Sequence, residues 1–584
     1  MPKYPNINDD KFYKKINDIY KEYRIKKDEK TLEDICYPKK YKLQLPQKFL
    51  AEFINPKTQY KGILVYHKIG AGKTCAAVRI AEKWKKYKRI IVVVPASLKN
   101  NFRGELRSMC ADDNYLTKKE RDELKKHKPT DKRYKEIIKI SDKRIDEHYD
   151  IYSYNKFVEL AGNKKLKLKN SLLIVDEIQN MVSEDGSFYN ALYDIIKKSP
   201  EDLRIVLLSA TPMFDKPNEI ALTMNLLRIP NELPIGRDFD KKFISVKKKK
   251  NGDIDYDIIN GDVFKKAIKG YVSFFRGAPQ VAFPKMSIKY VECEMSDFQY
   301  NSYLKLLKQE EKMEKKSSKK SKKFINNLDV SDLPNNFYIG TRMISNIVFP
   351  NRKVNAQGYK SLTTKKILNN LEKYSCKFFE IMEKIERSSG KIFVYSNFKE
   401  YGGIKAFKKV LKAYGYKDYI KYGSGHKRYA LWSGDESISI KEEIKSVYNA
   451  KDNLKGKQIK ILLGSPSIKE GVSLTAVRQV HVMESYWNRS RLDQVIGRAS
   501  RYCSHKDLND NSRKVKVYIY VAVVPYRKNK ESFETVDQYI RKLSVGKEKI
   551  IKKFEELIKE AAIDCNLNKN SNNDDGNEDI KCDK

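Results

Sequence analysis

The chain has 584 residues, 40% of them apolar and 11% aromatic, which allows several domains with buried cores and excludes a largely disordered polymer. Its formal net charge is +43; codon bias towards lysine accounts for part of this excess, and the rest indicates a polyanionic partner, most simply nucleic acid. We expect no signal peptide and no membrane partner, because the N-terminus is polar and no stretch of eighteen apolar residues occurs.

Four short apolar runs rich in β-branched residues come first along the chain, with charged helical patterns between them. They occupy residues 62–66, 89–95, 171–177 and 204–212. Bounded runs of this length are typical of buried parallel strands joined by crossover helices. They predict a first α/β domain.

A second set of apolar runs predicts a second α/β domain. These runs occupy residues 391–397, 458–465, 477–484 and 516–524. The stretch between the two sets, roughly 231–370, lacks this rhythm.

Lysine-rich and asparagine-rich segments lie outside these runs. Residues 247–253 and 311–324 are rich in lysine. We interpret the second as a solvated loop or helix end, with a nucleic-acid contact as the alternative. Residues 566–584 have the composition of a disordered tail.

The eight cysteines are scattered, and none forms a C-x-x-C pair. This pattern argues against a zinc finger or a disulfide scaffold. It favours a reducing compartment.

Residues 65–75 read VYHKIGAGKTC and lie between a predicted strand and a predicted helix, residues 74–86. This is the context of a phosphate-binding loop. Gly70 and Gly72 let backbone N–H groups point inward at phosphates, and the helix N-terminus adds a favourable dipole.

The side chains of the loop suit the same chemistry. Lys73 would supply a positive charge to the β- and γ-phosphates, and Thr74 a hydroxyl to Mg²⁺. The first loop position, usually glycine, is His67. We expect a packed or solvent-facing imidazole there and not a phosphate contact.

Asp176 and Glu177 follow the buried strand of residues 171–177, at the edge of a parallel sheet where ligands bind. Asp176 can hold Mg²⁺ through water, and Glu177 can orient and deprotonate the attacking water. An acidic helix cap is the alternative, which the loop upstream makes much weaker.

The ordered set of motifs resembles superfamily 2 helicases and translocases. The resemblance extends from about residue 45 to residue 505 and implies two RecA-like domains, with ATP and Mg²⁺ in the cleft between them. Beyond the phosphate loop, the matching segments are VVVPASLKNNF (92–102), DEIQ (176–179), SATP (209–212), SPSIKEGVSL (465–474) and QVIGRASR (494–501).

The resemblance assigns roles to further residues. Gln179, Ser209 and Thr211 would couple hydrolysis to domain movement, and Gly471 would contact the nucleotide. Gln179 stands where the family has His or Asp, which leaves the coupling contact open. Gln47 is the candidate adenine-reading glutamine, although its spacing after proline departs from the family pattern.

Gln494, Arg498 and Arg501 are spaced at about one helical turn each, which predicts a shared helix face. That face would meet the γ-phosphate from the second domain, with one arginine acting as an arginine finger. The spacing does not say which one.

A narrower resemblance is to the poxvirus early transcription factor small subunit, the poxvirus nucleoside triphosphatase I and their giant-virus relatives. It is carried by VYSNFKEYGGI (394–404), by the His-first loop and by YVSFFRG (271–277). SYWNRSRLDQVIGRASR (485–501) is also similar to Swi/Snf-type translocases.

We therefore predict an α/β protein of two RecA-like domains with a helical or irregular inserted region and a disordered C-terminal tail. The predicted parts are an N-terminal extension (1–40), an ATP-binding RecA-like domain (41–230), an intervening region (231–370), a second RecA-like domain (371–530) and a C-terminal helix with the tail (531–584).

The predicted function is that of an ATP-dependent helicase or translocase acting in viral transcription, at early initiation or at termination. The alternative is a DNA-binding transcription factor whose ATPase acts only as a release switch. Expected partners are DNA or RNA, viral RNA polymerase or a second factor subunit. The expected location is the virion and the host cytoplasm.

Overall fold

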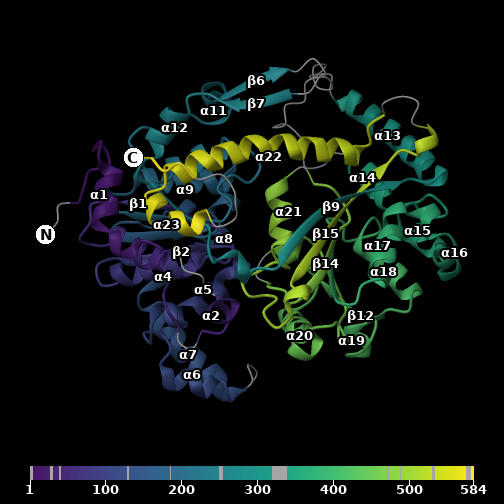
Figure 1. Ribbon diagram of the computed structural model, residues 1–584, viewed down its shortest axis with the longest axis horizontal. Coiled ribbons are helices and arrows are strands. Elements are labelled where there is room, and N and C mark those ends of the chain that lie inside the picture. The colour runs from purple at the N-terminus through teal and green to yellow at the C-terminus, as the bar shows by residue number, and fades with distance from the viewer. Residues whose placement is uncertain are drawn as a thin grey trace. The chain divides into compact units, whose positions relative to one another are not determined.

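The computed structural model consists of two compact units (Figure 1). Unit 1 comprises Met1–Gln280 and Glu548–Lys584, and unit 2 comprises Val281–Lys547. The described residues are 4–26, 31–38, 41–127, 131–183, 186–248, 254–317, 338–469, 472–486, 488–528, 533–573 and 580–583.

Unit 1 is built around a sheet in which every strand pairing is parallel. The four apolar runs predicted as buried parallel strands are confirmed, and β3 and β8 add an edge on each side. In order across the sheet the strands are β3 (Tyr149–Ser153), β2 (Arg89–Val94), β4 (Ser171–Val175), β5 (Arg204–Ser209), β1 (Gly62–His67) and β8 (Val272–Phe275).

Alternate residues of these strands belong to two different hydrophobic cores, one on each face of the sheet. On β1, Leu64 and Tyr66 pack into one core, and Ile63 and Val65 into the other. Because side chains alternate across a strand, a sheet covered on both faces needs an unbroken apolar run. This requirement explains why the strands could be recognised in the sequence.

Helices supply the other half of both cores. Those of unit 1 are α1 (Phe12–Ile19), α2 (Leu32–Cys36), α3 (Leu45–Phe53), α4 (Lys73–Trp84), α5 (Lys99–Leu106), α6 (Lys118–Leu124), α7 (Lys132–Asp146), α8 (Tyr154–Gly162), α9 (Ser187–Lys198), α10 (Glu219–Asn225), α11 (Gly236–Phe243), α12 (Gly261–Ile268) and α23 (Cys565–Asn572). A long helix, α22 (Val536–Glu560), begins in unit 2 and ends in unit 1.

Unit 2 contains a second sheet, also parallel throughout. Its strands, in order, are β11 (Lys417–Asp418), β12 (Arg428–Trp432), β13 (Ile461–Gly464), β10 (Lys391–Tyr395), β14 (Val477–Val482), β15 (Lys514–Val523) and β9 (Lys285–Glu294). Its helices are α13 (Asp297–Ser317), α14 (Ile339–Asn346), α15 (Ala356–Ser361), α16 (Thr364–Tyr374), α17 (Cys376–Glu386), α18 (Ile404–Ala413), α19 (Tyr419–Tyr422), α20 (Ile438–Asn449) and α21 (Arg489–Ile496). Two parallel sheets flanked by helices confirm the predicted architecture.

Residues 231–370, expected to form an intervening region, contribute β8 to the first sheet and β9 to the second. They also form the antiparallel hairpin of β6 (Ile244–Lys248) and β7 (Ile254–Ile258). The lysine-rich runs at 247–253 and 311–324 lie largely outside the described residues. None of the described helices combines the length and apolar character that crossing a membrane requires.

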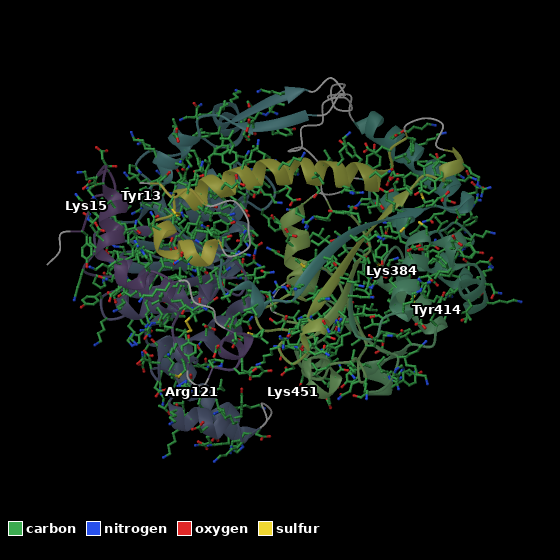
Figure 2. All side chains as sticks on the ribbon, in the orientation of Figure 1. Tyr13, Lys15, Arg121, Lys384, Tyr414 and Lys451 are labelled. Carbon is green, nitrogen blue, oxygen red and sulfur yellow. A yellow bond between two sulfur atoms is a disulfide. The ribbon has the colours of Figure 1, made fainter. Side chains whose placement is uncertain are left out.

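Both ends of the chain pack onto unit 1. The Tyr13 hydroxyl (labelled in Figure 2) donates to the carbonyl of Ala561 at 2.9 Å, and the N–H of Ile25 donates to the carbonyl of Leu567 at 2.8 Å. Residues 566–572, whose composition assigns them to a tail, lie in the helix α23 and contribute buried side chains. Composition missed this because tertiary contacts, such as the burial of Leu567, order the segment.

Two disulfides lie in unit 1, although the cysteine spacing argued against a disulfide scaffold. Cys75 pairs with Cys110 and Cys565 with Cys582, with Cα–Cα distances of 5.5 and 5.6 Å. The fold brings each pair within disulfide range, and the sequence separations of 35 and 17 carry no signature of it.

Candidate functional site

Three neighbouring strands of unit 1 end at the same edge of the sheet. They are β4, β5 and β1, and the segments that follow them carry the predicted carboxylates, the SATP segment and the phosphate loop. Since ligands bind at the carboxyl ends of parallel strands, this edge is the candidate site.

The phosphate loop has the backbone that its glycines predict. Gly70 has φ 84° and Gly72 has φ 71°, both in the left-handed region that favours glycine. Gly72 is the N-cap of the twelve-residue helix α4, so free N–H groups and the positive end of the helix dipole face the loop. Together these features make an anion-binding site.

Gln47 lies directly against this loop. Its Nε2 donates to the carbonyl of Gly72 at 3.2 Å, and its Oε1 accepts from the N–H of Gln44 at 2.9 Å. A Cβ on Gly72 would lie 2.3 Å from that nitrogen. Gln47 therefore holds the loop, and a side chain at position 72 would have to displace the Gln47 amide.

Lys73 joins the loop to both carboxylates. Its Nζ lies 2.8 Å from Glu177 Oε1 and 3.5 Å from Asp176 Oδ1. Burial opposes the charge on Lys73, but Glu177 and Asp176 outweigh it, and the pKa of Lys73 is raised. Burial also raises the pKa of Asp176, against the opposing effect of Lys73.

The three residues predicted to couple hydrolysis to movement form one hydrogen-bonded chain. Gln179 Nε2 donates to Glu177 Oε2 at 2.6 Å, and Ser209 Oγ donates to Gln179 Oε1 at 2.7 Å. The N–H of Thr211 donates to Ser209 Oγ at 3.0 Å. Gln179 thus supplies both a donor and an acceptor where the family has His or Asp.

Glu177 has φ 51° and ψ 48°, an uncommon left-handed conformation for a residue with a side chain. The Tyr154 hydroxyl donates to the carbonyls of Asp176 and Glu177 at 2.6 and 3.0 Å. Tyr154 was missed in the sequence because nothing local marks it; only the pairing of β2 with both β3 and β4 brings it close.

The other side chains at this edge of the sheet offer oxygen atoms as candidate ligands for a cation. Thr74 follows Lys73 in the first turn of α4, and two carboxylates lie at the end of β4. Hydroxyl and carboxylate oxygens are the donors that Mg²⁺ prefers. The residues therefore fit a nucleotide bound with this cation.

His67 is packed and does not face solvent, in agreement with one of the two expectations for it. Its ring is fully buried, and Nε2 lies 2.9 Å from Ser273 Oγ. Burial, and then the charge of Lys73, lower the pKa of His67 to about 3, so the ring is neutral.

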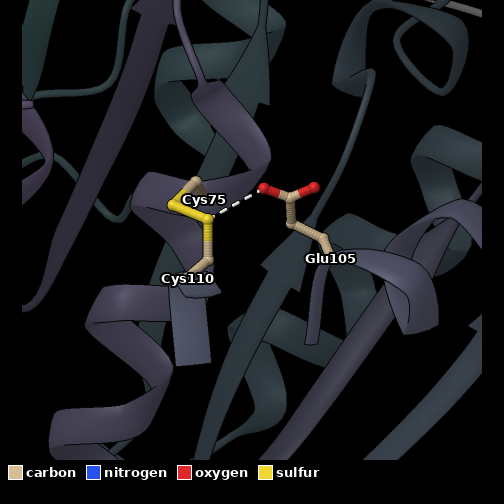
Figure 3. A group of neighbouring side chains, drawn as sticks. All are labelled: Cys75, Glu105 and Cys110. Carbon is tan, nitrogen blue, oxygen red and sulfur yellow. Dashed lines mark hydrogen bonds between the residues drawn. A yellow bond between two sulfur atoms is a disulfide. The ribbon is translucent and has the colours of Figure 1, made fainter. Parts of the chain in front are cut away.

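The Cys75–Cys110 disulfide joins the first turn of α4 to the segment after α5 (Figure 3). Cys110 Sγ lies 2.9 Å from Glu105 Oε1, and both cysteines are buried. The phosphate loop is thus followed at once by a covalent crosslink.

The predicted helix face in unit 2 was wrong. Gln494 lies in α21, but the helix ends at Ile496; Arg498 lies in the turn that follows, and Arg501 lies in the irregular segment after that turn. The N–H of Arg498 bonds to the carbonyl three residues back, so the chain tightens after Gly497 and the helical period is lost. Gly471 lies outside the described residues.

The fold and this edge of the sheet define a P-loop nucleoside triphosphatase. Residues 48–220 match the DEAD/DEAH box helicase family, and residues 374–503 match the helicase conserved C-terminal domain.

The chain is 51% identical to a protein of Acanthamoeba polyphaga mimivirus named as an ATP-dependent RNA helicase, R563, over 100% of this chain and 99% of that one. It is 25% identical to a termination factor NPH-I homolog of African swine fever virus (Tick/South Africa isolate), over 96% of this chain and 85% of that one.

The chain belongs to the superfamily 2 helicases, in the group formed by NPH-I and its giant-virus relatives, and it is an ATP-hydrolysing enzyme of the helicase type.

Proposed function

We propose that the edge formed by β1, β4 and β5 binds ATP with Mg²⁺ and hydrolyses it to drive movement along nucleic acid. The observation that carries this proposal is the position of Lys73, within 2.8 Å of Glu177 and 3.5 Å of Asp176 at the N-terminus of α4. A phosphate held there meets the loop N–H groups, a buried ammonium and a carboxylate together.

The roles of the residues follow from their chemistry. Gly70, Gly72 and Lys73 hold the β- and γ-phosphates, and Thr74 and Asp176 hold Mg²⁺, which when bound neutralises phosphate charge. Glu177 orients the attacking water and accepts its proton. Tyr154 holds the backbone of Glu177, and Lys73 and Gln179 hold its carboxylate oxygens.

Other predicted residues complete the proposal. Gln47 contacts the adenine as well as the loop, and Gly471 contacts the nucleotide. Gln494, Arg498 and Arg501 act on the γ-phosphate, with one arginine as the finger. Gln179, Ser209 and Thr211 pass the state of Glu177 to the segment after β5, which their hydrogen-bonded chain supports.

The substrate is nucleic acid held mainly by its phosphates, which the net charge of +43 supports. The relatives named as RNA helicases and as termination factors support a role in viral transcription, at transcript release and termination. Viral RNA polymerase is the expected protein partner, and the virion and host cytoplasm the expected locations.

The test compares ATPase rates with single-stranded DNA, duplex DNA and RNA, together with ATP-dependent displacement of a triplex-forming strand. Glu177→Gln should bind ATP and lose turnover, while Glu201→Gln, a surface partner of Lys61, should keep the parent rate. Normal turnover in Glu177→Gln refutes the site. Stimulated hydrolysis with no displacement on any track refutes the motor and leaves a release switch.

A further inference from the structure

The first residue of the phosphate loop is bonded, through one serine, to the C-terminal segment of the chain. His67 Nε2 lies 2.9 Å from Ser273 Oγ on β8, and that hydroxyl donates to Asp564 Oδ2 at 2.6 Å. All three side chains are fully buried. The serine and the aspartate are 291 residues apart in sequence.

These bonds have one direction. The serine hydroxyl hydrogen goes to the carboxylate, so its oxygen accepts from the neutral imidazole, which carries its hydrogen on Nε2. His67 therefore donates to Ser273, and Ser273 donates to Asp564. A glycine at position 67 could not make this connection.

Both carboxylate oxygens of Asp564 accept hydrogen bonds. Oδ1 accepts from the N–H of Phe274 at 2.9 Å, and Oδ2 also accepts from Asn568 Nδ2 at 2.9 Å. The same amide donates to the carbonyl of Phe274 at 3.1 Å. These hydrogen bonds of Asp564 and Asn568 tie β8 to the first residues of α23.

A second contact reaches the middle of the loop. Gly277, just beyond β8, has φ 113°, and a Cβ built on it would lie 3.2 Å from Ala71 Cβ. Its carbonyl accepts from Ser571 Oγ at 3.1 Å. The C-terminal segment thus bonds to Gly277, and Gly277 packs against Ala71 of the loop.

A third contact comes from α22, where Glu555 Oε1 lies 3.5 Å from Lys68 Nζ. Residues 67, 68 and 71 of the loop therefore each meet the C-terminal segment directly or through one intervening residue.

We infer that residues 555–572 are a positioning element of the nucleotide site, and that Asp564 acts on the phosphate loop through Ser273 and His67. The inference rests on the proposed function of that loop. A glycine-rich loop has many backbone states, and ordering it on binding costs conformational entropy. Neighbours that fix the loop beforehand remove this cost from nucleotide affinity.

Such an element should change KM for ATP more than kcat, because a preorganised loop binds the ground and transition states alike. We expect Asp564→Asn and Ser273→Ala each to raise KM about tenfold, the effect of one lost buried hydrogen bond. The double variant should also be about tenfold worse, because both substitutions break one chain.

Two controls accompany these variants. Asp583→Asn alters a residue beyond this element, at its ion pair with Lys265 and outside the chain of bonds, and should leave KM within twofold of the parent. Lys73→Ala tests the proposed function separately and should abolish turnover.

The outcomes separate the two claims. If Lys73→Ala is inactive while Asp564→Asn and Ser273→Ala match Asp583→Asn, the positioning role is wrong and the ATP site stands. Multiplying effects in the double variant, near a hundredfold, also overturn the role, since the two residues would then act independently. Normal turnover in Lys73→Ala overturns both. If Asp564→Asn fails to fold, Ser273→Ala, which removes a single oxygen, decides alone.

Discussion

Replacing Gln179 by alanine should remove the hydrogen-bonded connection between the Glu177 carboxylate and the SATP segment. The side chain is 4% exposed and makes two bonds, one to Glu177 at 2.6 Å and one from Ser209 at 2.7 Å. A bond to a carboxylate contributes about 1.5–3 kcal/mol and a neutral one about 1 kcal/mol. Gln179→Ala should therefore lower the free energy of unfolding by about 2.5–4 kcal/mol.

The hydrogen bond between Gln179 and Ser209 also predicts how the stability losses of the two alanine variants combine. Ser209→Ala alone should cost about 2 kcal/mol, because it removes the neutral bond from the N–H of Thr211 as well as the bond to Gln179. In the double variant with Gln179→Ala that bond is already absent, so the total should fall short of the sum by about 1 kcal/mol. Urea unfolding of the four proteins measures this difference.

Gln299→Ala is the matched control. It is a fully buried glutamine of unit 2 that bonds to the carbonyls of Ile344 and Ser345 and accepts from the N–H of Cys376. Both variants should lose stability, but only Gln179→Ala should lose nucleic-acid-stimulated kcat. Equal stability losses with unchanged stimulated kcat in both would show that Gln179 is structural, and the coupling argument would fail.

Three further predictions concern the loop, the finger and the crosslink. Gly72→Ala should abolish ATP binding, because the left-handed conformation costs about 1–2 kcal/mol and the new methyl group meets Gln47. Gly104→Ala is the control: it has open space around it in α5 and should stabilise the protein by about 0.5–1 kcal/mol. Calorimetric ATP titration and thermal melting compare the two variants. Arg501→Ala should keep nucleotide affinity and lose on the order of 10³-fold in stimulated kcat, and a lower Tm with kcat within a few-fold would contradict a finger role. Cys110→Ser should lower the free energy of unfolding by about 4 kcal/mol, as expected for a crosslink that closes a 35-residue loop. If the crosslink causes this loss, a reducing agent should abolish the difference between the variant and the parent.

The sequence by itself determined the elements whose signal is local. The strand at 62–66, the glycine turn, the helix after it and the carboxylates at 176–177 are each specified by residues within a few positions of one another. A strand covered on both faces must be apolar throughout, and a tight anion-binding turn must contain glycine, so these features are visible in one dimension.

Local periodicity did not determine where a helix ends, nor which sheet a strand without a clear local signal joins. The turn period of Gln494, Arg498 and Arg501 predicted one helix face, but the helix ends before both arginines. Strands β8 and β9 escaped notice as members of the two sheets, because each joins partners far away in the chain.

Only the tertiary structure decided which distant residues support the loop. His67 departs from the usual glycine of the loop, and the sequence does not show that it becomes a hydrogen-bond donor once Ser273 and Asp564 lie beside it. The pairing of Cys75 with Cys110 was equally invisible. The physical reason is the same in both cases. Burial and the choice of a hydrogen-bond or disulfide partner depend on chain segments that folding brings together, and residue type alone does not say which segments these are.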